Sequence, residues 1–460
     1  MSIAEFPLAR NADPIAERLR ARLENDIGNA ERFVERHGDE VMYVPGLGWY
    51  VWDGRRWVLD TADAAIKRMA QTTAKAIFRE SEYLGDPDAA TRRSKWAANS
   101  GKSSRLDAML KEARPHLIRK QDELDTDPNL LNVKNGTIDL RTGDLRPHDR
   151  ADLITKLAPV NYRGPRDSVH WSAFLDRVVP DPEVQEFLQR FLGYGITGLT
   201  VEQALLFLIG GGANGKTTFL EAIRNVLGDY CVTLPFGALL HTDGRGGGAT
   251  PDIAKLVGTR LVFASEPEVG QRFSEGIIKH LTGSDTITAR NLYKGPIEFK
   301  PAFSLIIAGN NRPTIRGTDE AIWRRFYLVP FEEFIPPEER DRDLPAKLNR
   351  EMSAILGWIV EGAQLWFESG LKAPEVVQAA TTSYRQENDA VSQFIDEMTT
   401  TEDGAWLANK ELRAAYDEWC KENGYHPLGG KLFGQRLEGM GYPARKYRGI
   451  RGRSGLRLFQ

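Results

Sequence analysis

The feature of this sequence that most constrains its fold is a glycine-rich segment between an apolar run and a helical pattern. It reads Gly210-Gly211-Gly212-Ala213-Asn214-Gly215-Lys216-Thr217-Thr218, which satisfies the pattern GxxxxGK followed by Ser or Thr. The apolar residues 204–209 precede it, and residues 219–226 have helical periodicity. Glycines let the backbone wrap around phosphates so that N–H groups point inward, and the helix N-terminus adds a partial positive charge. The segment therefore predicts a phosphate-binding loop between a buried strand and a helix.

Two side chains of this loop have the chemistry that a nucleoside triphosphate requires. We expect the whole segment from Gly210 to Thr218 to bind ATP, with Lys216 reaching the β- and γ-phosphates. The Thr217 hydroxyl is the expected ligand of Mg²⁺. The alternative is a glycine-rich turn that binds nothing, but strand, loop, lysine, hydroxyl and helix are all present here.

A pair of carboxylates follows the next apolar run. Residues 261–264 have the pattern of a buried strand and lead into Ser265-Glu266-Pro267-Glu268. Because open α/β sheets bind their ligands at the carboxyl ends of the strands, one carboxylate can hold the water shell of the metal and the other can orient the attacking water. Glu266 is the candidate metal ligand beside Thr217, and which glutamate activates water stays open. The alternative is two solvated glutamates on a loop.

Two further residues complete the candidate catalytic set. A third apolar run, residues 303–308, is followed by Asn310, whose amide can contact the γ-phosphate and the attacking water. The alternative for this Asn-Asn-Arg-Pro sequence is a turn. Arg325 lies in the segment 321–326, and an arginine stabilises the charge that develops during phosphoryl transfer. If Arg325 acts on the nucleotide of a neighbouring subunit, hydrolysis needs an oligomer; the alternative is a surface arginine in a charged helix.

Composition limits the class of protein. At roughly 150 residues per domain, a chain of 460 residues predicts about three domains. Lys and Arg total 61 and Asp and Glu total 64, which gives a net charge of −3. This charge excludes a uniformly basic protein that coats nucleic acid. The only cysteines, Cys231 and Cys420, form no pattern for a disulfide scaffold or a zinc site. With no signal-like start and no apolar run near the roughly 20 residues that span a bilayer, we expect a cytoplasmic protein without membrane contact.

The amino-terminal part predicts two β-hairpins after a polar helical region. Residues 48–58 contain Asp53-Gly54 between aromatic and β-branched residues, which indicates a type I′ turn, and residues 131–140 repeat the pattern with Asn135-Gly136. Trp49, Trp52 and Trp57 of the first hairpin are interpreted as core, with base stacking as the alternative. Residues 161–168 have the composition of a linker.

Several motifs, in this order and at this spacing, resemble one known family. They are residues 130–136, 187–194, 210–218, 264–268, 278–285, 310–313 and 323–326. Together they are similar to the superfamily III helicase module of phage and plasmid primase-helicases, which is related to the poxvirus primase-helicase. The resemblance covers roughly residues 130–335. It implies an α/β fold with an AAA+-like ATPase core, in which a parallel sheet is flanked by helices.

The resemblance also assigns roles to individual residues. The implied catalytic residues are Lys216, Glu266, Glu268, Asn310 and Arg325. The two glutamates would be the Walker B carboxylates, the asparagine sensor 1, and the arginine a finger that acts in trans. Lys279 falls in an additional motif of the family, where it can also reach the phosphates.

The same resemblance implies one contact with DNA, whereas one departure from the family argues against primer synthesis by this chain. The family places a hairpin, here residues 286–299, in a central pore, with Arg290, Tyr293 and Lys294 as DNA contacts; the pattern alone favours an ordinary surface hairpin. Relatives often begin with a primase domain built on paired aspartates and a histidine. Asp125 and Asp127 lack the accompanying histidine pattern, so we interpret them as loop carboxylates.

The last 32 residues are strongly basic. Residues 429–460 contain eight basic residues and one acid, Glu438, which gives a local net charge of +7. Helical patterns at residues 410–422 and 430–440 precede an alternating segment, residues 445–458, and this order predicts a winged-helix-like domain that binds DNA. The candidate contacts are Arg445, Lys446, Arg448, Arg451 and Arg453. The alternative is a solubilising basic tail.

These predictions combine into one expected organisation. We expect an α+β helicase-associated and oligomerisation domain over residues 1–165, the ATPase domain over 166–345, a helical connector over 346–385 and the basic domain over 386–460. The function that these imply is an ATP-dependent DNA helicase, by family analogy a hexamer with 3′→5′ polarity. It would act on single-stranded and forked DNA in the replication of a phage, prophage or plasmid in a bacterial cytoplasm, alongside a separate primase or polymerase. The alternatives are an origin-binding initiator that unwinds little, and a DNA packaging or remodelling ATPase.

Overall fold

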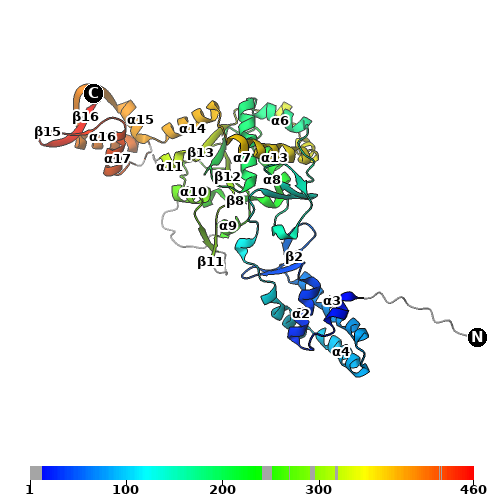
Figure 1. Cartoon of the computed structure of the whole chain (residues 1–460). Coiled ribbons are helices and arrows are strands. Elements are labelled where there is room, and N and C mark those ends of the chain that lie inside the picture. Colours follow the sequence, from blue (N-terminus) through cyan, green and yellow to red (C-terminus); the bar gives the residue numbers. More distant parts are fainter. Residues whose placement is uncertain are drawn as a thin grey trace, which may run out of the picture. The chain divides into compact units, whose positions relative to one another are not determined.

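The computed structural model describes residues 13–459 except 241–250, 269, 291–295, 316–319, 424 and 426 (Figure 1). The chain divides into two compact units. Unit 1 consists of Met1–Gly164 with Val226–Tyr230, and unit 2 of Pro165–Asn225 with Cys231–Gln460. The boundary at residue 164 lies within the expected linker. No helix in the described part of the chain is both long enough and apolar enough to cross a bilayer.

Unit 1 begins with helices around a small antiparallel sheet. The helices are α1 (Pro14–Leu19), α2 (Asp26–His37), α3 (Ala64–Glu80), α4 (Pro87–Ser100) and α5 (Ser103–Ala113), and the strands are β1 (Val41–Val44), β2 (Gly48–Trp52) and β3 (Trp57–Leu59). Asp13, Asn25 and Asp86 cap α1, α2 and α4 with side-chain oxygens that accept backbone N–H groups of the first turn. Helices α2, α3 and α5 share one core with β1 and β2, which contains Phe33, Trp49 and Met109.

The first predicted hairpin exists, but its turn differs from the expected one. Trp52 pairs with Trp57, so the loop has four residues instead of two. The Asp53 carboxylate accepts the backbone N–H groups of Arg55 and Arg56 at 2.8 and 2.9 Å, and Gly54 has a positive φ of 93°. The side-chain hydrogen bonds of Asp53 stabilise the longer loop. Trp49 and Trp57 are 2% and 5% exposed, which confirms the interpretation of these two residues as core.

The second predicted hairpin, β4 (Leu130–Val133) and β5 (Gly136–Asp139), is followed by β6 (Leu145–Arg146). Val133 pairs with Gly136, so Lys134 and Asn135 form the turn. The Asn135 side chain donates to the Tyr162 carbonyl and accepts the Tyr162 N–H, both at 2.8 Å. This asparagine therefore holds the chain that leaves unit 1, in addition to standing in the turn.

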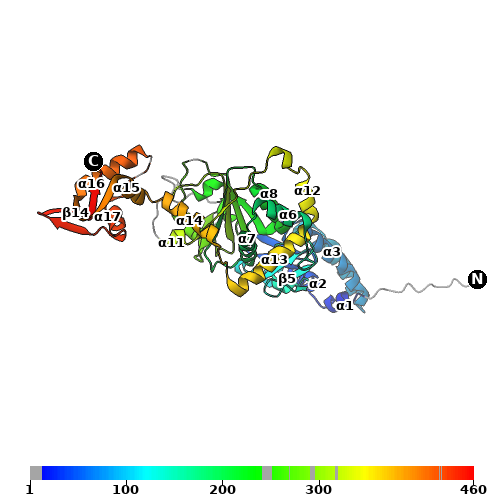
Figure 2. The ribbon, with the colours of Figure 1, turned by 90° about the horizontal axis from the view of Figure 1, so that it is seen from above.

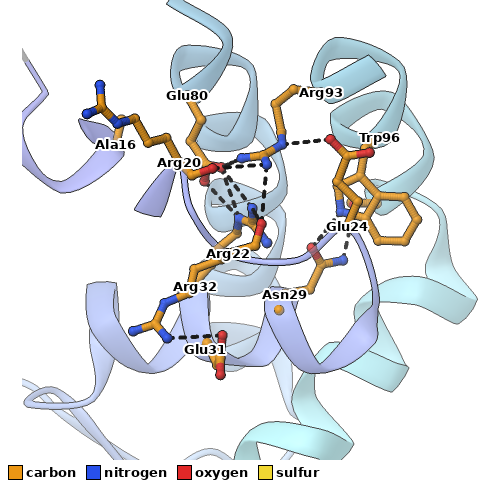
Figure 3. Close-up of polar contacts among 12 residues, drawn as sticks. Ala16, Arg20, Arg22, Glu24, Asn29, Glu31, Arg32, Glu80, Arg93 and Trp96 are labelled. Carbon is orange, nitrogen blue, oxygen red and sulfur yellow. Dashed lines mark hydrogen bonds and ion pairs between the residues drawn. The ribbon is translucent and has the colours of Figure 1, made fainter. Parts of the chain in front are cut away.

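A buried ion network joins three helices of unit 1 (Figure 3). The Arg32 guanidinium donates to both oxygens of Glu80, at 2.8 and 2.9 Å, and both side chains are 0% exposed. Arg93 also binds Glu80 and donates to Glu24 at 3.0 Å. The remaining guanidinium N–H groups reach the carbonyls of Arg20, Arg22 and Leu23. The network thus joins α2, α3 and α4 and fastens the loop between α1 and α2.

Unit 2 is built on a five-stranded parallel sheet (Figures 1 and 2). The strand order is β13 (Phe326–Pro330), β7 (Leu205–Ile209), β12 (Ser304–Gly309), β9 (Leu261–Ser265) and β8 (Cys231–Leu234). Every residue of β7 and β12 is buried, which requires that both faces of the sheet are covered. The helices drawn beside it include α6 (Val169–Val178), α7 (Pro182–Thr197), α8 (Lys216–Leu227) and α13 (Met352–Ser369). The predicted α/β core is confirmed, and elements α6 to α14 are called the sheet domain below.

The segment expected to be a helical connector is instead part of the sheet domain. It contains α12 (Leu344–Arg350), α13 and α14 (Glu375–Glu387). α13 packs on α7 so closely that a Cβ at Gly193 would lie 2.0 Å from the backbone N of Ala363. Tyr384 of α14 is 1% exposed in the core under the sheet, where its hydroxyl donates to the Pro313 carbonyl.

The end of α14 is also bonded to the loop that follows β12. Arg312 donates to Glu387 at 2.6 Å, and the Ile315 N–H donates to the Asn388 side chain at 2.8 Å. These contacts fix residues 312–315 against the last turn of α14.

The expected pore hairpin is present as two antiparallel strands. β10 (Ile287–Arg290) pairs with β11 (Pro296–Phe299), with Arg290 opposite Pro296. Tyr293 and Lys294 lie outside the described residues, as does the side chain of Arg290, so these predicted DNA contacts stay predictions. Three short helices complete the domain: α9 (Pro251–Ala254), α10 (Glu275–Thr282) and α11 (Glu320–Trp323).

The carboxy-terminal module has winged-helix topology. Its elements in chain order are α15 (Ala390–Met398), β14 (Thr399–Ala408), α16 (Asn409–Glu422), α17 (Gly430–Gly439), β15 (Ala444–Tyr447) and β16 (Ile450–Leu458). The strands form an antiparallel sheet in the order β14, β16, β15, over a core that includes Phe394, Tyr416 and Phe433. The two predicted helices and the predicted two-stranded wing are confirmed, whereas α15 and β14 were not expected.

Candidate nucleotide-binding site

The phosphate-binding loop connects β7 to α8 and is fastened to the chain after β13. Gly215 has φ +85° and Ala213 φ +50°, left-handed values that favour glycine at such positions. The Asn214 side chain donates to the Phe331 carbonyl at 2.7 Å, and the Ala213 carbonyl accepts the Ile335 N–H at 2.8 Å. The protein's own hydrogen bonds therefore hold the loop in its curved conformation.

Lys216 lies inside this loop with neutral partners. It is 6% exposed, and its Nζ donates to the Gly210 carbonyl and to Asn214 Oδ1, both at 2.9 Å, and to Asn310 Oδ1 at 3.2 Å. Burial holds the pKa of Lys216 below its usual value. A buried ammonium surrounded by amide and carbonyl oxygens is not neutralised by the protein, and a phosphate group would supply the missing negative charge.

The two predicted carboxylates follow β9 and are exposed. The Glu266 N–H donates to the Ala308 carbonyl of β12 at 3.0 Å, and Glu266 has φ +66°, a conformation that residues other than glycine seldom adopt. The Glu268 N–H donates to Gln271 Oε1 at 2.9 Å. The Asn311 side chain donates to the Pro267 carbonyl at 3.0 Å, so the loops after β9 and β12 are bonded to each other.

One cavity of about 730 Å³ brings these residues together. It is lined by loop residues 212–218 together with Glu266, Glu268 and Asn310. Gly210 and Gly211 are not among its lining residues, although the Gly210 carbonyl accepts from Lys216. The Thr217 hydroxyl and the Glu266 carboxylate share the cavity and are oxygen donors of the kind that Mg²⁺ prefers, so these residues fit the expected ion.

Two lining residues were not predicted. Glu221 and Arg224 lie four and seven positions after Thr217 on α8, and all three line the cavity. Their spacing places them on one face of the helix, which is the signal that could have identified them. Lys279, in contrast, lies on α10 and is not a lining residue of this cavity.

The structure corrects the position of the predicted arginine finger. Arg325 is 7% exposed; its Nε donates to Thr282 Oγ1 at 3.1 Å and its Nη1 to the Ala321 carbonyl at 2.6 Å. These bonds hold Arg325 between α10 and α11 within its own domain. Arg325 is therefore bonded within the fold of its own chain.

Arg324 is the exposed member of the pair. Its Nη2 donates to Gln203 at 2.7 Å. Both arginines directly precede β13, whose first residue pairs with the first residue of β7. Because β7 and β13 are parallel and the phosphate-binding loop follows the other end of β7, Arg324 and the loop of the same chain lie at opposite edges of the sheet.

The predicted basic contacts of the carboxy-terminal module also separate by exposure. Arg445, Lys446, Arg448 and Arg451 are exposed. Arg453 is only 6% exposed and donates to Glu438 Oε1 and to the Tyr442 carbonyl, both at 3.1 Å. Arg453 is thus bonded within the module and is less accessible than the four exposed residues.

Three family models match the chain. Residues 30–192 match the model described as D5 N terminal like, residues 208–325 a family of unknown function, and residues 386–448 the model described as Poxvirus D5 protein-like. The predicted resemblance to poxvirus-type primase-helicases is confirmed by the first and third of these models.

Curated relatives come from large DNA viruses. A protein named "Putative helicase" of Acanthamoeba polyphaga mimivirus is 28% identical over 332 residues, which are 67% of this chain and 34% of that protein. A second "Putative helicase", of Frog virus 3, is 29% identical over 310 residues, 63% of this chain and 30% of that protein. Other relatives, from African swine fever virus, are named "Putative primase". The chain spans about a third of the length of these relatives.

Among solved structures, the apo form of the NrS-1 C terminal region is similar to this chain. The sequence identity is 12% and the TM-score 0.41, with 64% of this chain and 77% of that chain covered.

Proposed function

We propose that this chain, which carries a D5 N terminal like domain and a Poxvirus D5 protein-like domain, is an ATP-driven helicase that acts in DNA replication. It hydrolyses ATP in the cavity beside the phosphate-binding loop and uses the energy to move along DNA and separate its strands. We place it in the replication of a phage, prophage or plasmid genome, in the cytoplasm of the host, with a separate primase or polymerase.

The observation that carries this proposal is the arrangement of charge in one cavity. Lys216 is a buried cation with neutral partners, and the carboxylates of Glu266 and Glu268 line the same cavity. Lys216 and the loop N–H groups bind the phosphates, and one carboxylate orients the attacking water. Mg²⁺ at Thr217 and Glu266 would neutralise phosphate charge. Asn310, which reaches Lys216, is placed to sense the γ-phosphate.

The positions of the arginines support hydrolysis between subunits. Arg324 lies at the sheet edge opposite the phosphate-binding loop of its own chain, so a cation from this position can reach a nucleotide only on another subunit. We therefore propose that Arg324, not Arg325, stabilises the transition state in trans. By the family resemblance the oligomer is a hexameric ring with 3′→5′ polarity.

Strand displacement by the full-length chain tests this function. Forks with a 3′ or a 5′ single-stranded tail are incubated with ATP and Mg²⁺, beside a measurement of ATPase activity with and without single-stranded DNA. We expect ATPase activity that single strands stimulate, and displacement from the 3′-tailed fork. The control is Lys216→Ala, which should neither hydrolyse ATP nor displace a strand.

The same measurements separate the alternatives. An origin-binding initiator would bind one duplex sequence strongly and displace little from either fork. A packaging or remodelling ATPase would be stimulated by duplex DNA. ATP turnover by Lys216→Ala would remove the assignment of the site itself.

A further inference from the structure

The wing of the carboxy-terminal module, which consists of β15, β16 and their turn, carries charge of a single sign. From residue 441 to residue 460 the sequence has six basic residues and no acid. Tyr447 pairs with Ile450, so Arg448 and Gly449 form a two-residue turn, and both have positive φ, 49° and 83°, as in a type I′ hairpin. All four residues of β15 are exposed.

Two cations of the wing stand directly opposite each other. Lys446 pairs with Arg451 in the register of β15 and β16, which places both side chains on one face. Like charges at such positions destabilise a sheet. Among the described residues neither cation has an acidic partner, whereas Arg453 binds Glu438 and Arg457 lies 3.6 Å from Glu402. Lys446 and Arg451 are therefore available to bind negative charge on another molecule.

The tip of the wing is apolar and exposed. Tyr447 and Ile450 are 53% and 58% exposed and lie on the face opposite Lys446 and Arg451. The Arg448 guanidinium lies 5.4 Å from the centre of the Tyr447 ring, and the Trp406 ring packs beside it at 5.7 Å. An aromatic ring held in this way presents a firm apolar surface on which a base can stack.

Helix α17, at the position of a recognition helix, offers less to DNA. Its exposed side chains include Lys431, Leu432 and Gln435, together with the acid Glu438. Arg436 of the same helix binds Asp389, and Glu438 binds the wing residue Arg453. The helix thus contributes one exposed cation and one exposed acid, while the wing contributes five exposed cations, of which only Arg457 has an acidic partner among the described residues.

We propose that the wing, and not α17, is the principal DNA contact of this module, and that it binds the junction between single-stranded and duplex DNA. Lys446 and Arg451 bind backbone phosphates, and Tyr447 and Ile450 stack on the last base pair of the duplex. The proposal rests on the proposed function in one respect, the use of forked DNA as substrate.

The phosphate contact is tested by DNA binding of the full-length chain without nucleotide, at several salt concentrations. For Lys446→Ala combined with Arg451→Ala we expect binding to a fork to weaken by about tenfold or more, and the salt dependence to fall by about two phosphate contacts. Matched controls are Arg457→Ala, an exposed arginine beside an acid in the same sheet, and Lys431→Ala combined with Gln435→Ala on α17. Both controls should bind within about twofold of the unchanged chain. A larger loss from the α17 variant than from the wing variant would overturn the proposal.

The junction contact is tested with Tyr447→Ala combined with Ile450→Ser. The probes are a fork, a blunt duplex and a single strand of the same sequence. We expect this variant to bind the duplex and the single strand as the unchanged chain does, but to lose its preference for the fork, by about fivefold to tenfold for one stacked base. An unchanged preference for the fork, or an equal loss on all three probes, would overturn the role of the tip.

Failure of the proposed function gives a different result from failure of this inference. A chain that binds none of the three probes is not the proposed helicase. If the unchanged chain binds the fork and the wing variants bind it equally well, only the assignment of the wing is wrong. The ATPase activity of each variant without DNA, together with its thermal unfolding, shows that the substitutions leave the rest of the chain intact.

Discussion

Arg32 in unit 1 and Lys216 in the sheet domain are both buried cations, 0% and 6% exposed, but they have different partners. Arg32 makes two hydrogen bonds to the carboxylate of Glu80, which Arg93 also binds. Lys216 donates only to neutral oxygens, and burial lowers its pKa. The first cation is neutralised within the fold, and the second is left for a ligand to neutralise. Burial of a charge does not by itself distinguish a structural residue from a functional one; the charge of its partners does.

The largest effect is expected from substitution of Lys216, the buried cation whose hydrogen-bond partners are neutral. Lys216→Ala should lower ATP hydrolysis by more than about 1000-fold, because the phosphates lose their main cation. Its unfolding temperature should stay the same or rise, since a costly buried charge is removed. ATPase activity and thermal unfolding of the same preparation check both expectations. A large loss of stability would show that Lys216 supports the fold as Arg32 does.

The converse substitution is Glu80→Ala in unit 1. It leaves the cations of Arg32 and Arg93 buried without their carboxylate, so the free energy of unfolding of this unit should fall by about 3–5 kcal/mol. Denaturant unfolding followed by tryptophan fluorescence measures it. The matched control is Glu35→Ala, which breaks the exposed pair with Arg18 and should cost less than about 1 kcal/mol. Equal losses for the two variants would contradict the role of burial.

Arg324 and Arg325, which are adjacent in the sequence, provide the same contrast between a functional and a structural cation. Arg324→Ala should lower ATPase activity at least about 100-fold while leaving the unfolding temperature unchanged. Arg325→Ala should lower the unfolding temperature, because Arg325 is bonded to Thr282 and Ala321. Mixing Arg324→Ala with Lys216→Ala subunits should restore part of the activity. No recovery at any ratio would count against a site shared between subunits.

A carboxylate can be introduced beside Lys216 to copy the situation of Arg32. Asn310 accepts from Lys216 at 3.2 Å and is exposed, so Asn310→Asp places an anion there without disturbing the core. We expect the affinity for a non-hydrolysable ATP analogue to fall about tenfold, since the new charge repels the phosphates. Asn310→Ala, which adds no charge, should lose less. Equal losses would show that the amide and not the charge matters.

Glu351 shows the reverse case, an anion held mainly by hydrogen-bond donors. Burial alone would raise its pKa, but bonds from Ser168, the His170 ring and the backbone N–H groups of His170 and Trp171 lower it from 4.5 to about 2. Because the folded pKa is the lower one, this stabilisation is present above pH 4.5 and is lost as the pH falls toward 2. Glu351→Gln should cost about 1–2 kcal/mol at pH 7, and the difference in unfolding temperature should disappear near pH 2. A difference independent of pH would contradict this.

Much of the site was predictable because its signals are local. The glycine pattern, the strand before Glu266 and the strand before Asn310 each occupy fewer than ten consecutive residues. Their meeting in one cavity follows from the rule that the carboxyl ends of parallel strands share an edge. The wing was predictable for the same reason, since alternation and a turn suffice to indicate it.

What failed depended on partners distant in sequence. The sequence alone does not distinguish Arg324 from Arg325, because the burial of Arg325 involves partners such as Thr282, which is 43 residues away. Arg453 was read as one cation among several, because its bond to Glu438 requires the packing of the wing on α17. α14 was read as a connector, because nothing in its own sequence shows that Tyr384 enters the core under the sheet.

The bonds between the loop after β12 and the end of α14 have a mechanical consequence. Asn310 begins that loop, and Pro313, Arg312 and Ile315 are tied to residues 384–388, directly before the first helix of the carboxy-terminal module. If the loop is displaced when Asn310 gains or loses contact with a phosphate, these hydrogen bonds give the displacement a direct path to the start of α15.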